Sequence, residues 1–263
     1  MGQMTEQAEY EYSPSRGRRV NRPMPKVEEI DRDEFIHERW DYQPGEHVTI
    51  LGPNKRGKST LGFQLLQVSA TKEMNAYVLW SKPRDADLIA LAKKSHFQIS
   101  PVYPPDKKLF KPAKVYVIQP PQTMRDLKRD KAVLQSTFRE TMMDCYASKQ
   151  PRIVFLDEAQ EIQANLKLKE ECEAIWKRGR TSPCGQWALA QRSAYNSQDM
   201  YNAPEHLILF NDPDKRNRER FSEIGGVDPD IVTDTVYNLK PFQAMYLKRT
   251  GPGGRPCLCV INP

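Results

Sequence analysis

Residues 52–59 read GPNKRGKS, and the residue types in this stretch suit the binding of a phosphate chain. Gly52 and Gly57 allow the backbone to curl so that successive N–H groups point inward. Lys58 supplies a cation for the β- and γ-phosphates, and the Ser59 hydroxyl supplies an oxygen ligand for Mg²⁺. The spacing G-x-x-x-x-G-K-[ST] therefore predicts a loop that binds ATP together with Mg²⁺.

The flanking sequence supports this prediction, because a short apolar strand is expected over 47–51 and a helix over 58–68. The N-terminus of that helix adds partial positive charge facing the triphosphate. Arg56 either touches the γ-phosphate or, like Lys55, faces solvent or a neighbouring subunit. The residues expected to contact the nucleotide are Gly52, Pro53, Asn54, Lys55, Arg56, Gly57, Lys58, Ser59 and, on the α-phosphate side, Thr60.

Farther along the chain, the apolar run IVFL at 153–156 leads directly into two acids, Asp157 and Glu158. At the end of a buried strand, Asp157 is placed to hold Mg²⁺ through its water shell. Glu158 is placed one step farther out, where a carboxylate can act as general base on the attacking water. Nucleoside kinases and small GTPases generally lack such an adjacent glutamate, so the pair favours ATP hydrolysis over phosphotransfer.

Three further polar side chains complete the predicted catalytic set. A strand expected over 187–190 ends at Gln191. In ATPases with these two motifs a polar residue at that place lies between them and senses the γ-phosphate, which is the role expected of Gln191; the alternative is an exposed strand end. Arg178 and Arg180 stand at the end of a predicted helix, from which an arginine can project into the site of a neighbouring subunit. The attraction of basic residues to a helix C-terminus is the alternative explanation, and Arg192 is a third candidate.

These residues must be positioned by an alternation of short apolar strands and helices. Strands are predicted over 47–51, 76–80, 114–118, 153–156, 187–190 and 206–210, and helices over 58–68, 86–94, 124–148 and 163–177. Such alternation predicts an α/β fold, a three-layer sandwich whose mainly parallel central sheet is covered on both faces. Residues 243–248 and 257–261 predict a C-terminal β-hairpin.

The N-terminal residues are polar and carry a basic run, Arg16, Arg18, Arg19, Arg22 and Lys26. We expect a flexible basic arm over 1–35 and a single ATPase motor domain over 36–263. The arm either docks on a neighbouring subunit or on DNA, or is a solvated tail. Trp40 and Tyr42, just before the first strand, either pack on the adenine or belong to the core.

The composition limits the class of protein. No run approaches 18 apolar residues and no basic-then-apolar leader is present, so we expect a cytoplasmic protein without a membrane partner. The five cysteines are scattered and odd in number, which favours reduced thiols over a zinc site. The net charge of +6 suits a polyanionic partner, although mildly basic proteins are common.

Basic residues gather in three clusters that are candidate contacts to nucleic acid, each of which is alternatively a solvated face. The clusters are Lys107, Lys108, Lys111 and Lys114; Arg125, Lys128, Arg129 and Lys131; and Lys215, Arg216, Arg218 and Arg220.

Together, GPNKRGKS after a strand, IVFLDE, and the next strand ending at Gln191 resemble the additional-strand, catalytic-glutamate P-loop ATPases. Among these, residues 40–250 look like the HerA/FtsK-type translocases and the viral genome-packaging ATPases. The resemblance implies Walker A and Walker B motifs at the two sites and a homo-oligomeric ring in which Arg178 or Arg180 completes a neighbour's site. It also implies double-stranded DNA as a partner and, for a viral protein, a portal or capsid vertex in the host cytoplasm.

The leading hypothesis is therefore an ATP-hydrolysing nucleic-acid translocase that serves as a viral double-stranded DNA packaging motor. A motor for conjugation, phage assembly or chromosome handling is the second hypothesis. The third is a nucleotide-switched interaction protein that does not translocate.

Overall fold

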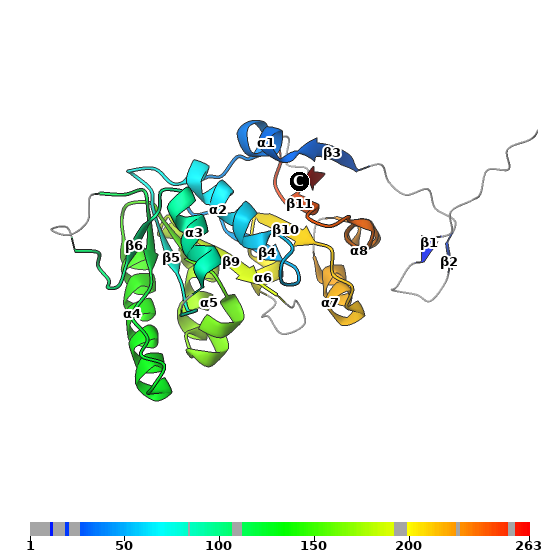
Figure 1. The fold of residues 1–263 in the computed structure, drawn as a ribbon. Helices are drawn as coiled ribbons and strands as arrows, with labels where there is room; N and C mark the ends of the chain where they lie inside the picture. Colours follow the sequence, from blue (N-terminus) through cyan, green and yellow to red (C-terminus); the bar gives the residue numbers. More distant parts are fainter. Residues whose placement is uncertain are drawn as a thin grey trace, which may run out of the picture.

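The computed structural model describes residues 27–83, 85–106, 112–191, 199–224, 227–251 and 256–263, and the backbone at 11–12 and 19–20. Within these residues a ten-stranded sheet has the order β3-β12-β11-β10-β4-β9-β8-β5-β7-β6 (Figure 1). In that order the strands are Glu28–Asp31, Cys257–Asn262, Ala244–Lys248, His206–Phe210, Val48–Leu51, Cys184–Ala190, Arg152–Leu156, Asn75–Leu79, Val115–Ile118 and Gln98–Ser100. β1 (Glu11–Tyr12) pairs only with β2 (Arg19–Val20).

The strands from β10 to β6 in this order all run parallel, which confirms the predicted mainly parallel sheet. The predicted strands are confirmed as β4, β5, β7, β8 and β10, each within one residue of its expected ends. β9 begins at Cys184, three residues before the expected start at Trp187. Gly185 and Gln186 interrupt the apolar pattern of the sequence, yet both are buried in the sheet.

Helices cover both faces of the sheet, which confirms the three-layer sandwich. Ile153 and Phe155 of β8 belong to an apolar cluster with α2 and α3, whereas Val154 and Leu156 belong to another with α4, α5 and α8. This division follows from the two-residue period of a strand. The helices are α1 (Arg32–Glu34), α2 (Lys58–Ser69), α3 (Ala86–Lys94), α4 (Leu127–Ala147), α5 (Lys169–Arg178), α6 (Asp199–Asn202), α7 (Lys215–Glu219) and α8 (Pro229–Asn238).

The helix predicted over 163–177 is interrupted at residues 166–168. A π-helical turn, Glu161–Asn165, precedes α5, and Lys167 between them has a left-handed backbone with φ of 56°. That conformation cannot continue a right-handed helix. Leu166 and Leu168 are buried on either side of the break, so packing of the two leucines accompanies the interruption.

The predicted C-terminal hairpin is confirmed by the antiparallel pairing of β11 with β12. β11 also pairs antiparallel with β10, so the hairpin extends the main sheet. Helix α8 was not predicted, although Asp228 followed by Pro229 is a helix-start signal: Asp228 accepts a hydrogen bond from the Asp230 N–H. In the described part of the chain no helix is long and apolar enough to cross a membrane.

The expected arm over 1–35 overlaps the folded sheet at its C-terminal end. Glu28–Asp31 forms β3, which pairs in parallel with β12 beside the C-terminus (Figure 1). Phe35 is fully buried, with its ring 4.8 Å from that of Tyr246. The alternation in β3 is weak, with only Ile30 buried, so sequence periodicity gave no signal for it. The basic run, apart from the backbone of Arg19, lies outside the described residues.

If residues 28–36 belong to the core, Phe35→Ala should lower the free energy of unfolding by about 3–5 kcal/mol, because it leaves a cavity under β11. Denaturant unfolding measures this change. Glu38→Ala, on the exposed face of the same segment, is the matched control and should change stability by less than about 0.5 kcal/mol. Equal, small effects of both variants would show that the segment does not pack on the sheet.

Candidate active site

The residues of the two predicted motifs and Gln191 meet at one edge of the sheet, where parallel strands end. Gly52 follows β4, Gln191 follows β9 and Asp157 follows β8. The register pairs Leu51 of β4 with Ala190 of β9, so the residues that follow lie side by side. Ligands of open α/β folds bind beyond the carboxyl ends of such strands.

The loop 52–59, called the glycine loop below, has the backbone that its glycines suggest. Gly57 has φ of 95°, and Lys55 is also left-handed with φ of 60°. Gly52 has φ of 151°, and a Cβ there would lie 2.5 Å from Phe210 Cβ on β10. Only glycine fits that close approach. Gly57 directly precedes α2, so unpaired N–H groups of the first helical turn face the loop.

Lys58 is buried at the start of α2, and its Nζ donates a hydrogen bond to the Pro53 carbonyl at 2.7 Å. Burial, together with the nearby Lys82 ammonium, lowers the pKa of Lys58 to about 8. Two cations close enough to disfavour each other make this part of the site suited to a polyanion.

Asp157 is 7% exposed, and burial raises the pKa of its carboxyl to about 6, with Lys82 acting in the opposite direction. Its Oδ2 atom is buried without a hydrogen-bond partner among the described residues. Asp157 and Ser59 line the same cavity. A buried carboxylate oxygen that lacks a donor, opposite a hydroxyl, is a donor set that fits Mg²⁺.

Glu158 is held by two neighbours at the mouth of the site. Gln191 Nε2 donates a hydrogen bond to Glu158 Oε1 at 2.9 Å, and Lys82 Nζ lies 3.0 Å from Glu158 Oε2. The contact with Gln191 links the ends of β9 and β8, as expected of a polar residue between the two motifs. Both carboxylate oxygens of Glu158 are therefore oriented by side chains from adjacent strands.

Lys82 is the site residue that sequence reasoning missed. It follows β5, and its Nζ lies 3.9 Å from Asp157 Oδ2 as well as near Glu158. Burial alone lowers the pKa of Lys82, but the two carboxylates outweigh it and raise the pKa. Its position just beyond the predicted strand 76–80, at the same sheet edge as the acids, was the available signal.

A cavity of about 500 Å³, a size that suits a small-molecule ligand, is lined by Lys58, Lys82 and Asp157. Glu158 lines a second cavity, which shares Lys82 with the first. Helix α3 forms the far wall of the first cavity, which the sequence did not indicate. Gly52, Pro53, Arg56 and Glu158 are not among its lining residues. The predicted residues that line it are Asn54, Lys55, Gly57, Lys58, Ser59, Thr60, Asp157 and Gln191.

Arg178, the candidate arginine whose side chain is described, does not lie at this edge. Arg178 is exposed at the end of α5, and the adjacent Gly179 packs against His47, which precedes β4. The amino end of β4 faces away from the glycine loop, so Arg178 cannot reach the site of its own chain. The Arg180 side chain and Arg192 lie outside the described residues.

Trp40 and Tyr42 also lie at the amino edge, so of the two expectations for them, core packing is confirmed. The Tyr42 ring lies 5.1 Å from that of Trp187, and Trp40 Nε1 donates to Ser69 Oγ at 2.8 Å. Ser69 ends α2, one helix length from the glycine loop. Neither aromatic ring can reach a nucleotide in that loop.

The charge on Asp157 should make folding stability depend on pH. Its folded pKa of about 6 exceeds the ordinary value near 3.9, so the contribution is favourable below about pH 4 and is lost as pH rises through 6. Asp157→Asn should therefore raise the free energy of unfolding at pH 8, by on the order of 1–2 kcal/mol, and raise it less at pH 5. Denaturant unfolding at both pH values tests this, with the exposed Asp87→Asn as control. A variant less stable than the wild type at pH 8 would contradict it.

No family model matches this sequence, and no curated protein matches it. Among solved structures, the chain is similar to the genome-packaging NTPase B204 of Sulfolobus turreted icosahedral virus 2. The AMP complex gives a TM-score of 0.54 at 13% identity, covering 83% of this chain and 98% of that one, and the sulfate complex gives 0.55 at 14% identity. EssC (ATPases 2 and 3) from Geobacillus thermodenitrificans gives 0.50 at 14% identity, with 84% of this chain and 40% of that chain covered. At these identities the likeness shows the fold alone: the chain shares its α/β fold with B204 and EssC.

Proposed function

We propose that this protein is an Mg²⁺-dependent ATPase that drives double-stranded DNA translocation in viral genome packaging. The observation that carries the proposal is the convergence of Lys58, Asp157, Glu158 and Gln191 beyond three adjacent parallel strands. Support for the packaging role comes from the fold likeness to B204, which spans nearly all of that protein. Packaging would take place in the host cytoplasm, at a portal or capsid vertex.

In the proposed reaction the glycine loop holds the triphosphate through its backbone N–H groups, and Lys58 exchanges the Pro53 carbonyl for phosphate oxygens. Glu158 accepts a proton from the water that attacks the γ-phosphorus, and ADP leaves. Gln191 and Lys82 keep the Glu158 carboxylate oriented. Mg²⁺, held by Ser59 and Asp157, would neutralise charge on the phosphates.

A ring of subunits would complete the site. Arg178 is exposed and lies at the sheet edge opposite its own glycine loop, so it can serve only a neighbouring molecule. Arg180 follows it by two residues and is the second candidate. Arg178 lies in the last turn of α5, where the helix dipole favours a cation. Stabilisation of α5 is therefore the competing explanation for an arginine at position 178.

The first turns of α4 are the proposed DNA contact. Arg125, Lys128, Arg129 and Lys131 are all exposed there, and α4 begins on the carboxyl side of β7, the same edge as the active site. Cations at a helix N-terminus oppose the helix dipole, so helix stability does not explain them. Of the other two clusters, Lys107, Lys108, Lys111 and the side chains of Lys215 and Arg218 lie outside the described residues.

Steady-state ATP hydrolysis with and without double-stranded DNA tests the proposal. We expect turnover that rises cooperatively with protein concentration and is stimulated by DNA. Glu158→Gln should reduce turnover by about 100-fold or more, because the general base is lost. Glu170→Gln, an exposed glutamate on α5, is the matched control. Slow ATP hydrolysis whose rate does not change when DNA is added would favour the nucleotide-switched interaction protein over the translocase.

Mixing two inactive variants tests the arginine in trans. Arg178→Ala should be inactive because it lacks the donor arginine, whereas Glu158→Gln lacks only the base. In mixed rings an intact site can face a Glu158→Gln subunit that still provides Arg178, so ATPase activity should reappear at an intermediate mixing ratio. If Arg178→Ala stays fully active, or no ratio restores activity, Arg178 is not the trans residue, and Arg180→Ala is then tested in the same assay.

A further inference from the structure

Phe242 is a large aromatic residue left exposed beside the glycine loop. It lies in the turn between α8 and β11, and 51% of its surface is exposed. A Cβ placed on Gly57 would lie 3.6 Å from Phe242 Cδ1 and 3.8 Å from Phe210 Cε1. An exposed ring therefore stands next to Gly57, the residue directly before the phosphate-facing helix α2.

The backbone of Phe242 is strained, with φ of 68° in the left-handed region. For a bulky residue this conformation costs on the order of 1 kcal/mol or more and persists only where the surroundings impose it. Three hydrogen bonds do so here: Gln243 N to the Lys240 carbonyl at 3.1 Å, Lys240 N to Gln243 Oε1 at 2.7 Å, and Arg32 Nη2 to the Phe242 carbonyl at 3.2 Å. The turn therefore fixes the backbone from which the exposed ring projects.

The sheet order separates this ring from the hydrolytic groups. Asp157, Gln191 and Lys82 follow β8, β9 and β5, on one side of β4, whereas Phe242 precedes β11, on the other side. A triphosphate held in the glycine loop with its γ-phosphate near Glu158 must extend its nucleoside end away from the acids. On the β10 and β11 side, Phe242 presents an exposed flat apolar face at the loop.

We propose that Phe242 stacks on the nucleobase of the nucleotide whose phosphates bind in the glycine loop, an inference that rests on the proposed ATPase function. Aromatic rings stack on bases through the π-face that every base has, so this contact adds affinity and little discrimination between adenine and guanine. Burial of the ring beneath a base also accounts for a strained, exposed phenylalanine that the apolar core does not use.

The test compares ATP with inorganic tripolyphosphate, which has the phosphates but no base, by calorimetric titration of the full chain in the presence of Mg²⁺. All variants carry Glu158→Gln so that ATP is not consumed. Phe242→Ala should weaken ATP binding by about tenfold and leave tripolyphosphate binding unchanged. Phe242→Trp should keep the ATP affinity, and ATP but not tripolyphosphate should quench its fluorescence. Val68→Ala, an exposed apolar residue at the far end of α2, is the control.

Phe242→Gly separates stacking from folding, because glycine adopts a positive φ without strain. It should lose ATP affinity as Phe242→Ala does while its Tm stays at or above that of the parent. Equal effects on both ligands, no effect on either, or a loss that tracks subunit dissociation in sedimentation would overturn the stacking role. Failure of the parent protein to bind either ligand would instead refute the proposed ATPase function.

Discussion

The candidate active site depends on the insertion of β9 between β4 and β8. All seven residues of β9 are buried, and its backbone hydrogen-bonds to β4 on one side and β8 on the other. The ladder continues past the strand, because Gly52 N donates to the Ala190 carbonyl at 3.2 Å. This pairing fixes the separation between the glycine loop and the two acids, and it leaves Gln191 between them. A slip of two residues in β9 would keep the apolar faces but misplace Gln191.

The residues of the site do not fully compensate its two buried charges, Lys58 and Asp157. Lys58 is buried with a lowered pKa and Asp157 is buried with a raised pKa, so each charge is disfavoured where it stands. Lys82 compensates the acids but lies close enough to Lys58 to disfavour that cation. A bound polyanion with a divalent cation would compensate both buried charges. Preorganised sites commonly lower the stability of the free protein in this way, because their charges are arranged for the ligand.

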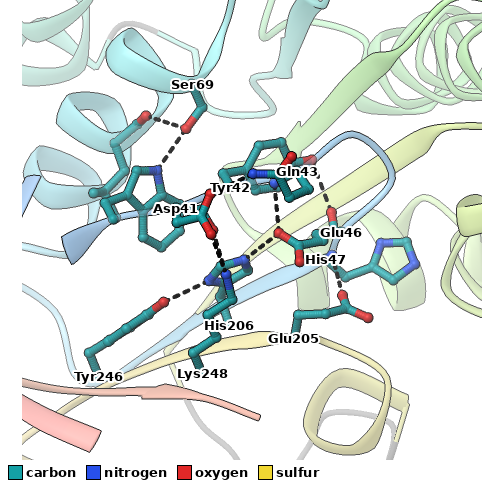
Figure 2. A network of polar contacts seen from close by, with 12 residues as sticks. Asp41, Tyr42, Gln43, Glu46, His47, Ser69, Glu205, His206, Tyr246 and Lys248 are labelled. Carbon is teal, nitrogen blue, oxygen red and sulfur yellow. Dashed lines mark hydrogen bonds and ion pairs between the residues drawn. The ribbon is translucent and has the colours of Figure 1, made fainter. Parts of the chain in front are cut away.

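The opposite, amino edge of the sheet has a closed polar network (Figure 2). His206 lies between Tyr246 Oη at 2.9 Å and Glu46 Oε2 at 2.8 Å, and Lys248 Nζ donates to the Asp41 carbonyl at 2.8 Å. Burial lowers the pKa of His206, which favours a neutral imidazole that donates to Glu46 and accepts from Tyr246. These hydrogen bonds hold the starts of β4 and β10 together at the amino edge, where no catalysis is proposed. Trp40 packs edge-on against Trp187, and its ring lies 4.6 Å from that of His206, so it belongs to this packed amino edge.

The sequence by itself determined the parts that depend on local pattern. Short apolar runs specified β4, β8 and β10, and the glycine spacing specified the loop, because both follow from backbone geometry over a few residues. Tertiary structure decided which distant segments lie together. Lys82 lies near Asp157, and β3 pairs with β12. Phe242 lies beside the glycine loop, whereas Trp40 lies far from it. These contacts join residues distant in sequence, and they are set by strand order and by the direction in which each side chain leaves the sheet, neither of which periodicity encodes.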